Sequence, residues 1–259
     1  MPGLTVVVPC YNEAERLDAA PLLAFLDGHP DASFVLVNDG STDTTGAVLD
    51  RLAAERPGRM RALQLAPNRG KAEAVREGLR NALAAGADIV GFLDADLSTP
   101  PGQIDDLRTA LARPGVQVAI GARVGLLGYD IDRSAVRHYL GRVFATAASL
   151  ILGIRVYDTQ CGAKLFRAGP ALADALSTPF RSRWAFDVEF LGRLLIASPG
   201  VQPLPLSAIV EVPLPIWHDV KGSKLGLGGM ARTMSDLALV AGDLAARRRA
   251  ARNHEKSAP

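Results

Sequence analysis

The sequence predicts an α/β fold in which helices cover both faces of a mostly parallel sheet. In the first half of the chain, short apolar runs of strand length alternate with longer segments of helical periodicity. This βαβα order is typical of parallel sheets, because each crossover connection lays a helix against one face. In addition, polar segments directly follow four of the apolar runs, and such sheets bind ligands at the carboxyl ends of their strands.

Five strands and four helices are expected in this first half. The first strand, LTVVVPC, is apolar throughout, as is typical of a strand buried on both faces. The helix after it contains Pro21, which is expected to interrupt it, and Ser41 or Asp43 is placed to cap the next helix. The third helix is apolar on one side, and the fourth begins with proline, as first helical turns often do. In order, the expected strands span 4–10, 33–40, 60–66, 88–96 and 116–123, and the expected helices span 12–28, 44–55, 70–87 and 101–112.

The second half of the chain is less regular. Prolines in its last strand place that strand at an edge of the sheet or in a loop. Because we find no linker and no internal repeat, we expect one domain over 1–259. In order, the expected elements are a long helix over 132–153, an extended turn and strand over 157–168, a helix over 183–198, a strand over 208–219, and an amphipathic helix over about 228–250 that is followed by a basic tail.

The composition narrows the class of protein. The net charge of +2 argues against a general nucleic-acid binder. The two cysteines, Cys10 and Cys161, match no disulfide framework or zinc motif, and we expect reduced thiols, as in a cytoplasmic protein. The longest apolar stretch, FATAASLILGI, is shorter than the roughly 20 residues of a membrane-spanning helix. We therefore expect no signal peptide and no transmembrane helix.

Two aspartates mark the end of the fourth expected strand. Asp94 and Asp96 lie two residues apart, so the chain must turn after Asp94 to bring both carboxylates towards one ligand. Hard cations such as Mg²⁺ and Mn²⁺ prefer carboxylate oxygens and keep positions for substrate phosphates. The alternative is a helix-capping turn in which Asp96 or Ser98 satisfies backbone amides.

Other strand ends carry residues suited to a nucleotide. Asp39 follows a buried strand and is placed to accept from a base or ribose, with Gly40 allowing a close backbone approach; the alternative is an ordinary Asp-Gly turn. Lys71 stands at a helix start, where backbone amides favour anions. Neither the P-loop spacing nor G-x-G-x-x-G occurs. Three arginines follow the fifth strand, and their guanidinium groups suit phosphate: Arg123, Arg133 and Arg137.

Together these residues predict a metal-held nucleotide diphosphate, and their motifs resemble the family 2 glycosyltransferases. The later motifs resemble the dolichyl-phosphate glucosyltransferase branch and its bacterial polyprenyl-phosphate relatives, and the likeness runs from about residue 4 to residue 241. The motifs are VVVPCYNE, VNDGSTD, NRGKAEAVREG, DADLSTPP and GARV, then DTQCGAKLF, RWAFDVEFL, VKGSK and MSDLALV.

The resemblance implies the GT-A fold, a three-layer αβα sandwich with a mixed, mostly parallel central sheet. It also implies a UDP-sugar donor, a hexose (glucose in this branch) moved with inversion, and a polyprenyl phosphate acceptor. The residue roles that it implies are nucleoside binding by Pro9, Tyr11, Glu13 and Asp39 with Lys71 nearby, nucleotide contact by Asp94, metal binding by Asp96, and phosphate contacts by Arg123, Arg133 and Arg137.

The acceptor decides whether the reaction needs a general base. A phosphate acceptor is already ionised at neutral pH, whereas a hydroxyl acceptor must lose a proton to a base. Asp158 and Asp187 are the candidates for that base, and Arg183 and Trp184 are expected to form one wall of the acceptor cleft. The alternatives are a soluble hydroxyl acceptor with the same donor and, from another class, a sugar-nucleotide sensor or a nucleotidyltransferase.

The C-terminal helix is a candidate for peripheral membrane contact. Its apolar stripe and basic end would suit the anionic inner face of a membrane. The alternative is a helix that packs on its own domain and ends in a solvated basic tail. The stripe consists of Met230, Met234, Leu237, Ala241 and Leu244, and Arg247, Arg248 and Arg249 follow it.

Overall fold

The computed structural model describes residues 3–132, 135–218 and 227–257 of the chain. Its centre is a seven-stranded sheet in the order β3-β2-β1-β4-β7-β5-β8. All neighbouring strands are parallel except β7, which runs antiparallel to both β4 and β5. The sheet is therefore mixed and mostly parallel, as predicted. The strands span Leu4–Cys10 (β1), Ala32–Asp39 (β2), Met60–Leu65 (β3), Ile89–Leu93 (β4), Val118–Ala122 (β5), Ala163–Arg167 (β7) and Ile209–Pro213 (β8).

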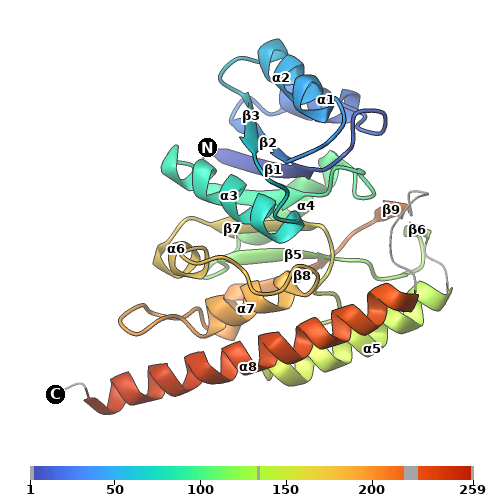
Figure 1. The fold of residues 1–259 in the computed structure, drawn as a ribbon. Coiled ribbons are helices and arrows are strands. Elements are labelled where there is room, and N and C mark those ends of the chain that lie inside the picture. Colours follow the sequence, from blue (N-terminus) through green and yellow to red (C-terminus); the bar gives the residue numbers. More distant parts are fainter. Residues whose placement is uncertain (1–2, 133–134, 219–226, 258–259) are drawn as a thin grey trace.

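Helices cover both faces of this sheet (Figure 1). The alternation of side chains along β1 divides the core, because Val6 and Val8 point to one face and Val7 to the other. The first face packs against α1 (Ala20–Gly28), α2 (Thr45–Glu55) and α4 (Ile104–Leu111). The other packs against α3 (Lys71–Ala84), α5 (Ala135–Leu152), α6 (Pro170–Ala175), α7 (Phe186–Leu195) and α8 (Leu227–Ser257). These layers form the predicted αβα sandwich.

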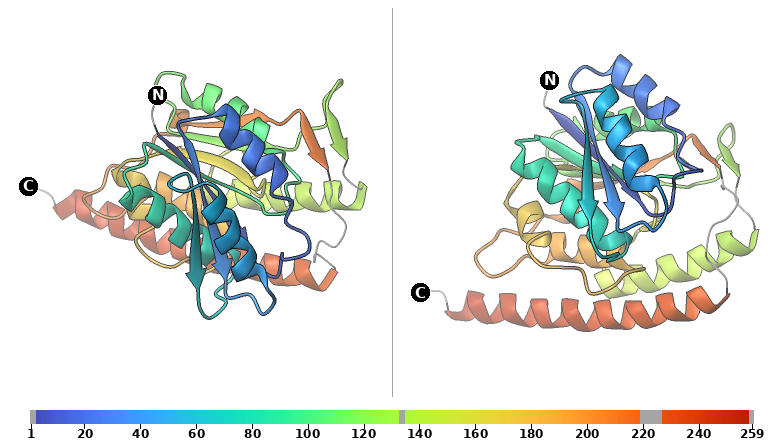
Figure 2. Two further views of the ribbon diagram at one scale, coloured as in Figure 1. Left: turned by 90° about the horizontal axis from the view of Figure 1, so that it is seen from above. Right: turned by 45° about the horizontal axis from the view of Figure 1, so that its top comes forward.

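The two longest helices, α5 and α8, lie side by side beneath α7 (Figures 1 and 2). Leu237, Val240 and Leu244 of α8 are buried in the core cluster. The stripe predicted for membrane contact thus packs on its own domain over this stretch, and the side chains of Met230 and Met234 lie outside the described ones. In the described part of the chain, no helix combines the length and hydrophobicity needed to cross a membrane.

One expected helix is wrong in its first half. The helix predicted over 12–28 begins only at Ala20, with Pro21 in its first turn. Asn12 instead adopts a left-handed backbone conformation (φ 53°), which Asn tolerates better than most residues. The amides of Asn12 and Glu13 donate to side chains of the next loop rather than to a helix. The interruption expected at Pro21 is in effect the helix start.

Four short elements complete the described part of the fold. β6 (Asp130–Asp132) pairs in parallel with β9 (Ile216–His218) outside the main sheet. A 3₁₀ turn, Pro101–Gln103, precedes α4, and another, Leu206–Ala208, precedes β8. β8 lies at the edge of the sheet, as its prolines predict.

Candidate active site

The loops that follow β1 and β2 interlock at the carboxyl edge of the sheet. The Asn12 amide donates to Ser41 Oγ (3.0 Å), and the Thr42 amide donates back to Asn12 Oδ1 (2.9 Å). The Glu13 amide donates to Thr45 Oγ1 over 2.8 Å. Tyr11 and Glu13, predicted nucleoside-binding residues of the first loop, are thereby held beside the second loop, and Pro9 lies at the end of β1. Tyr11 is 36% exposed and so presents its ring at this edge.

Asp39 fixes the loop that leads into α3. Its carboxylate accepts the amides of Arg69 (2.9 Å) and Gly70 (2.7 Å) and the side-chain amide of Asn68 (3.0 Å). Burial raises the pKa of Asp39, while these amides and the charge of Arg183 oppose the rise. Gly40 has φ 63°, and a Cβ on it would stand 2.5 Å from the Asn68 nitrogen. The backbone at Gly40 is therefore approached closely by the backbone of Pro67 and Asn68, in the loop before α3.

The start of α3 meets the end of β4 in an ion pair. Lys71 Nζ lies 2.6 Å from Asp94 Oδ1, and both side chains are partly exposed. Loss of water would lower the pKa of Lys71, but the carboxylates of Asp94, Asp187 and Asp96 together raise it. Lys71 is thus a fixed positive charge at a helix N-terminus, a combination suited to an anionic ligand.

Asp96 makes a local turn and keeps one oxygen available. Its Oδ1 accepts the Ser98 amide over 3.0 Å, as the capping alternative expected. Its other oxygen accepts no hydrogen bond from the described residues. Within the described ranges no group of three or more His, Cys, Asp or Glu side chains gathers to hold a metal. A Mg²⁺ or Mn²⁺ ion here would depend on Asp96 and on phosphate oxygens of a ligand, as Mg²⁺ sites commonly do.

Two residues beneath Asp94 were missed by sequence reasoning. The Asp94 amide donates to the carbonyl of Gly162, and a Cβ on Gly162 would stand 2.2 Å from the Asp94 carboxylate carbon. Lys164, only 1% exposed, places its ammonium 2.6 Å from Asp187 Oδ1. A lysine within the apolar strand GAKLF was the available signal, since a buried lysine requires a partner.

Asp187 itself lies under the site rather than in an open cleft. It is 5% exposed, at the start of α7. Burial raises its pKa, and the charges of Lys164 and Lys71 oppose this rise. Its proximity to Lys71 and Asp94 ties α7 to the strand-end cluster.

Arg123 and Asp158 form a third ion pair at the far side of this edge. Arg123 Nε and Nη2 donate to the two carboxylate oxygens over 2.6 and 2.8 Å, and the Arg123 amide adds a third bond. Burial would lower the pKa of Arg123, but Asp158 raises it. Trp217 lies 5.3 Å from the guanidinium, and Glu211 accepts the amides of Tyr157 and Asp158. The pair, which joins the end of β5 to the segment before β7, is therefore held in place by residues of β8 and β9.

The remaining predicted residues fall in three places. Arg183 lies beside Gly70, where a Cβ would stand 3.4 Å from its Nε, and its charge acts on Asp39. This position is close to Asp39, one of the predicted nucleoside residues, and the acceptor wall stays a prediction. Trp184, next to it, is 38% exposed. Arg133 lies outside the described residues, and Arg137 belongs to α5 but its side chain is outside the described ones.

The site thus gathers carboxylates and cations from several segments at one sheet edge, as expected of a protein that binds a phosphorylated ligand there. The sequence model of glycosyl transferase family 2 matches residues 5–171. The chain therefore belongs to glycosyl transferase family 2, and within it to the branch of the dolichyl-phosphate β-glucosyltransferases. It is a glycosyltransferase.

Curated relatives extend this likeness over most of the chain. The dolichyl-phosphate β-glucosyltransferase of Drosophila melanogaster is 36% identical over 238 residues, which cover 86% of this chain and 69% of the relative. The human enzyme of the same name is 33% identical with the same coverage. The polyprenol monophosphomannose synthase of Mycolicibacterium smegmatis is 28% identical, covering 78% of this chain and 76% of the relative.

Solved structures confirm the fold. Glucosyl-3-phosphoglycerate synthase from Mycobacterium tuberculosis, crystallised with UDP, has a TM-score of 0.67 and 22% identity, with 93% of this chain and 80% of that chain covered. The same enzyme with Mn²⁺, UDP-glucose and phosphoglyceric acid has a TM-score of 0.66 and 21% identity, with the same coverage. At this identity the likeness shows the GT-A fold alone, as predicted.

Proposed function

We propose that the protein is an inverting hexosyltransferase that moves glucose from UDP-glucose to the phosphate of a polyprenyl phosphate. One catalytic domain over 1–259 would carry the reaction. An oxygen of the acceptor phosphate forms a bond to C1 of the sugar, while the bond from C1 to the diphosphate breaks and UDP leaves with the electron pair. A single displacement of the α-linked sugar gives a β-linked product. The names of the relatives, dolichyl-phosphate β-glucosyltransferases, support this stereochemistry and this acceptor.

The observation that supports a phosphate acceptor is that both candidate bases, Asp158 and Asp187, are engaged in ion pairs. Both oxygens of Asp158 accept from Arg123, and the Gln160 amide adds a further bond to one of them. Asp187 is buried against the ammonium of Lys164. Neither carboxylate is free to take a proton from a hydroxyl. An ionised phosphate needs no such base, so this arrangement favours it over a soluble hydroxyl acceptor.

The donor would lie across the interlocked loops. Tyr11, Glu13 and Asp39 would face the nucleoside, with Pro9 at the end of β1. Lys71 and Arg183 would face the diphosphate near the start of α3, where positive charge gathers. The UDP and UDP-glucose bound in the structural neighbours support a uridine donor.

A divalent cation would be held by Asp96 and the donor phosphates. The oxygen of Asp96 that accepts no hydrogen bond from the described residues suits a hard cation. When bound, Mg²⁺ or Mn²⁺ would neutralise charge on the departing diphosphate. The Mn²⁺ in structures of the neighbouring enzyme supports a metal.

The lipid acceptor calls for contact with a membrane, and α5 offers a more exposed face than α8. Tyr139, Val143 and Leu150 are 70%, 62% and 79% exposed, and their spacing of four and seven residues places them on one helix face. The sequence of α5 contains Arg137, His138 and Arg142 and no acidic residue. We propose that this face lies on an anionic bilayer at its cytoplasmic side.

A transfer assay tests the proposal. The protein is supplied with labelled UDP-glucose, Mn²⁺ or Mg²⁺ and a short-chain polyprenyl phosphate, with an EDTA control and a lipid-free control. The expected result is label in the lipid phase only when metal and lipid are both present. Metal-dependent release of UDP without a lipid product would instead support a soluble acceptor. Binding of UDP-glucose with neither release of UDP nor transfer of glucose would support a sugar-nucleotide sensor. Transfer of the nucleotide itself would support a nucleotidyltransferase.

A further inference from the structure

A short segment before α7 is tied to the C-terminal helix through one carboxylate. Asp236 Oδ2 of α8 accepts the Ser182 hydroxyl over 2.8 Å and the Trp184 amide over 3.2 Å. Ser182 Oγ in turn accepts the Ala185 amide over 2.7 Å. Asp236 therefore connects α8 to residues 182–185 through two hydrogen bonds, although it lies about fifty residues further along the chain.

This segment carries Arg183 to the start of α3. Arg183 lies beside Gly70, and its charge acts on Asp39, which holds the same loop. Arg183 is exposed and forms no ion pair with the described residues. Its guanidinium is thus available to an anion at the helix N-terminus next to Lys71.

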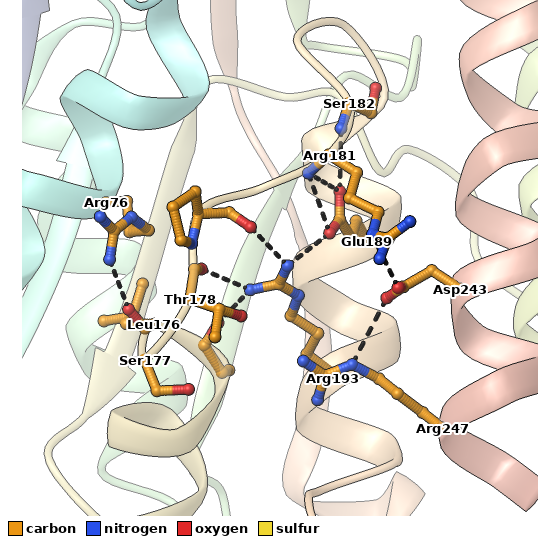
Figure 3. A network of polar contacts seen from close by, with 12 residues as sticks. Arg76, Leu176, Ser177, Thr178, Arg181, Ser182, Glu189, Arg193, Asp243 and Arg247 are labelled. Carbon is orange, nitrogen blue, oxygen red and sulfur yellow. Dashed lines mark hydrogen bonds and ion pairs between the residues drawn. The ribbon is translucent and has the colours of Figure 1, made fainter.

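Two side chains of α7 hold the part of the loop before Ser182 (Figure 3). Arg193 donates to the carbonyls of Ala175, Thr178 and Pro179 and pairs with Glu189 over 2.6 Å. Glu189 also accepts the amides of Arg181 and Ser182. The backbone of residues 175–182 therefore has bonds to side chains of α7 in addition to the side-chain contacts that Arg181 and Ser182 make with α8.

A second aspartate of α8 supplies a matched comparison. Asp243, two helical turns after Asp236, pairs with the side chains of Arg181 (3.0 Å) and Arg247 (3.4 Å). These are side-chain contacts (Figure 3). Among the described residues, Asp243 makes no hydrogen bond to the backbone of 182–185. Of the contacts described for these two aspartates, only those of Asp236 include a backbone amide of the segment that carries Arg183.

We propose that Asp236 is a positioning residue for the donor: through Ser182 and the Trp184 amide, α8 holds Arg183 at the place of the donor diphosphate. This inference rests on the proposed UDP-sugar donor. It gives α8 a part in donor binding in addition to its packing on the core.

The tie itself is tested without any ligand. The chain contains two tryptophans, Trp184 and Trp217. In a Trp217→Phe background, acrylamide quenching of fluorescence reports on Trp184 alone. Asp236→Ala is expected to raise the quenching constant, whereas Asp243→Ala leaves it unchanged and Asp236→Asn, which keeps an acceptor oxygen, restores it in part. An unchanged constant in Asp236→Ala, with an unchanged melting temperature, would overturn the tie.

The consequence is tested by UDP titration calorimetry in Mn²⁺. Asp236→Ala is expected to weaken UDP binding about tenfold, the equivalent of about 1.4 kcal/mol, while Asp243→Ala binds as the unaltered protein does. In an Arg183→Ala background, Asp236→Ala should cause no further loss, because the group that it positions is gone. Equal losses in both backgrounds would overturn the inference. If the unaltered protein binds no UDP, the proposed donor is wrong, and the quenching result still decides whether Asp236 holds the segment.

Discussion

The ammonium of Lys71 lies 2.6 Å from a carboxylate oxygen of Asp94. This pair joins the start of α3 to the end of β4 and leaves both groups partly exposed at the edge where the donor is proposed to bind. Because Asp94 holds the lysine in place, the positive charge is positioned before a ligand arrives.

Lys71→Met is expected to reduce kcat/KM for the donor by about tenfold to a hundredfold, since hydrogen bonds to charged groups contribute about 1.5–3 kcal/mol. The loss should appear mainly as weaker UDP binding, measured by calorimetry. Arg80→Met, on the exposed side of the same helix, is the control and should bind UDP normally. Equal affinities for the two variants would contradict a role for Lys71 at the diphosphate.

Asp96→Asn is expected to abolish the increase in UDP affinity that Mn²⁺ causes, because an amide oxygen is a weaker ligand than a carboxylate for a hard cation. Titrations of UDP with Mn²⁺ and with EDTA measure this increase. Asp106→Asn, on the exposed face of α4, serves as the matched control. A full metal effect in Asp96→Asn would remove Asp96 from the metal site.

Gly162→Ala is expected to displace the Asp94 carboxylate, because the added Cβ would stand 2.2 Å from its carbon and oxygen atoms. Transfer activity should fall by at least about tenfold, the effect of roughly 1.4 kcal/mol, while circular dichroism shows a retained fold. Gly102→Ala, where the added Cβ meets nothing within 4 Å, should remain active. Unchanged activity in Gly162→Ala would show that the position of Asp94 is unimportant.

The two thiols give a pH dependence of stability. Burial, with the charge of Glu13, raises the pKa of Cys10 to about 12; burial, with the charge of Asp158, raises that of Cys161 to about 11. Their contribution to stability is complete below about pH 9. It is lost as the pH rises towards 11, because the unfolded chain releases protons that the folded chain keeps. For each thiol, the free energy of unfolding should fall by about 1.4 kcal/mol per pH unit in this window.

Urea unfolding at pH 8 and pH 10 measures this loss. Since lysines and tyrosines also titrate in this range, the same measurement on Cys10→Ala/Cys161→Ala isolates the thiols. The double variant should show a smaller fall in the free energy of unfolding. An equal fall in both proteins would contradict the raised pKa values.

Val143→Asp/Leu150→Asp is expected to weaken binding to anionic vesicles, because it places charge on the exposed face of α5. Flotation with vesicles of phosphatidylglycerol and phosphatidylcholine measures the bound fraction. Leu239→Asp changes an exposed residue of α8 and leaves the α5 face intact, so it shows whether α8 is part of the same surface. Unchanged flotation in the first variant would exclude the α5 face.

Much of the sheet and its polar edge could be predicted from the sequence. The strands of the first half are mostly apolar runs. Asp94 follows one of these strands and Lys71 begins a helix, so the order of the elements alone brings the two residues together. The insertion of β7 between β4 and β5 could not be predicted, because strand neighbours depend on distant residues. For the same reason, the ion pair between Lys164 and Asp187 could not be predicted from the sequence.

Patterns also misled where local geometry prevails. The segment 12–19 has helical composition, but the bonds from its amides to Ser41 and Thr45 hold it as a loop. The apolar stripe of α8 is compatible with a membrane or with a core, and only packing shows that Leu237 and Leu244 face the core. Asp39 was expected to hold a ligand directly, and the structure adds that it fixes its own loop; its contact with the nucleoside stays a prediction.

The central claim is that the acceptor is a phosphate that needs no base from the protein. The most direct measurement compares transfer of labelled glucose from UDP-glucose to a polyprenyl phosphate and to the polyprenol of the same chain length, with Mn²⁺ present. The account predicts labelled product with the phosphate and none with the alcohol. Transfer to the polyprenol at a comparable rate would contradict it, because the ion pairs of Asp158 and Asp187 would then have to open to supply a base.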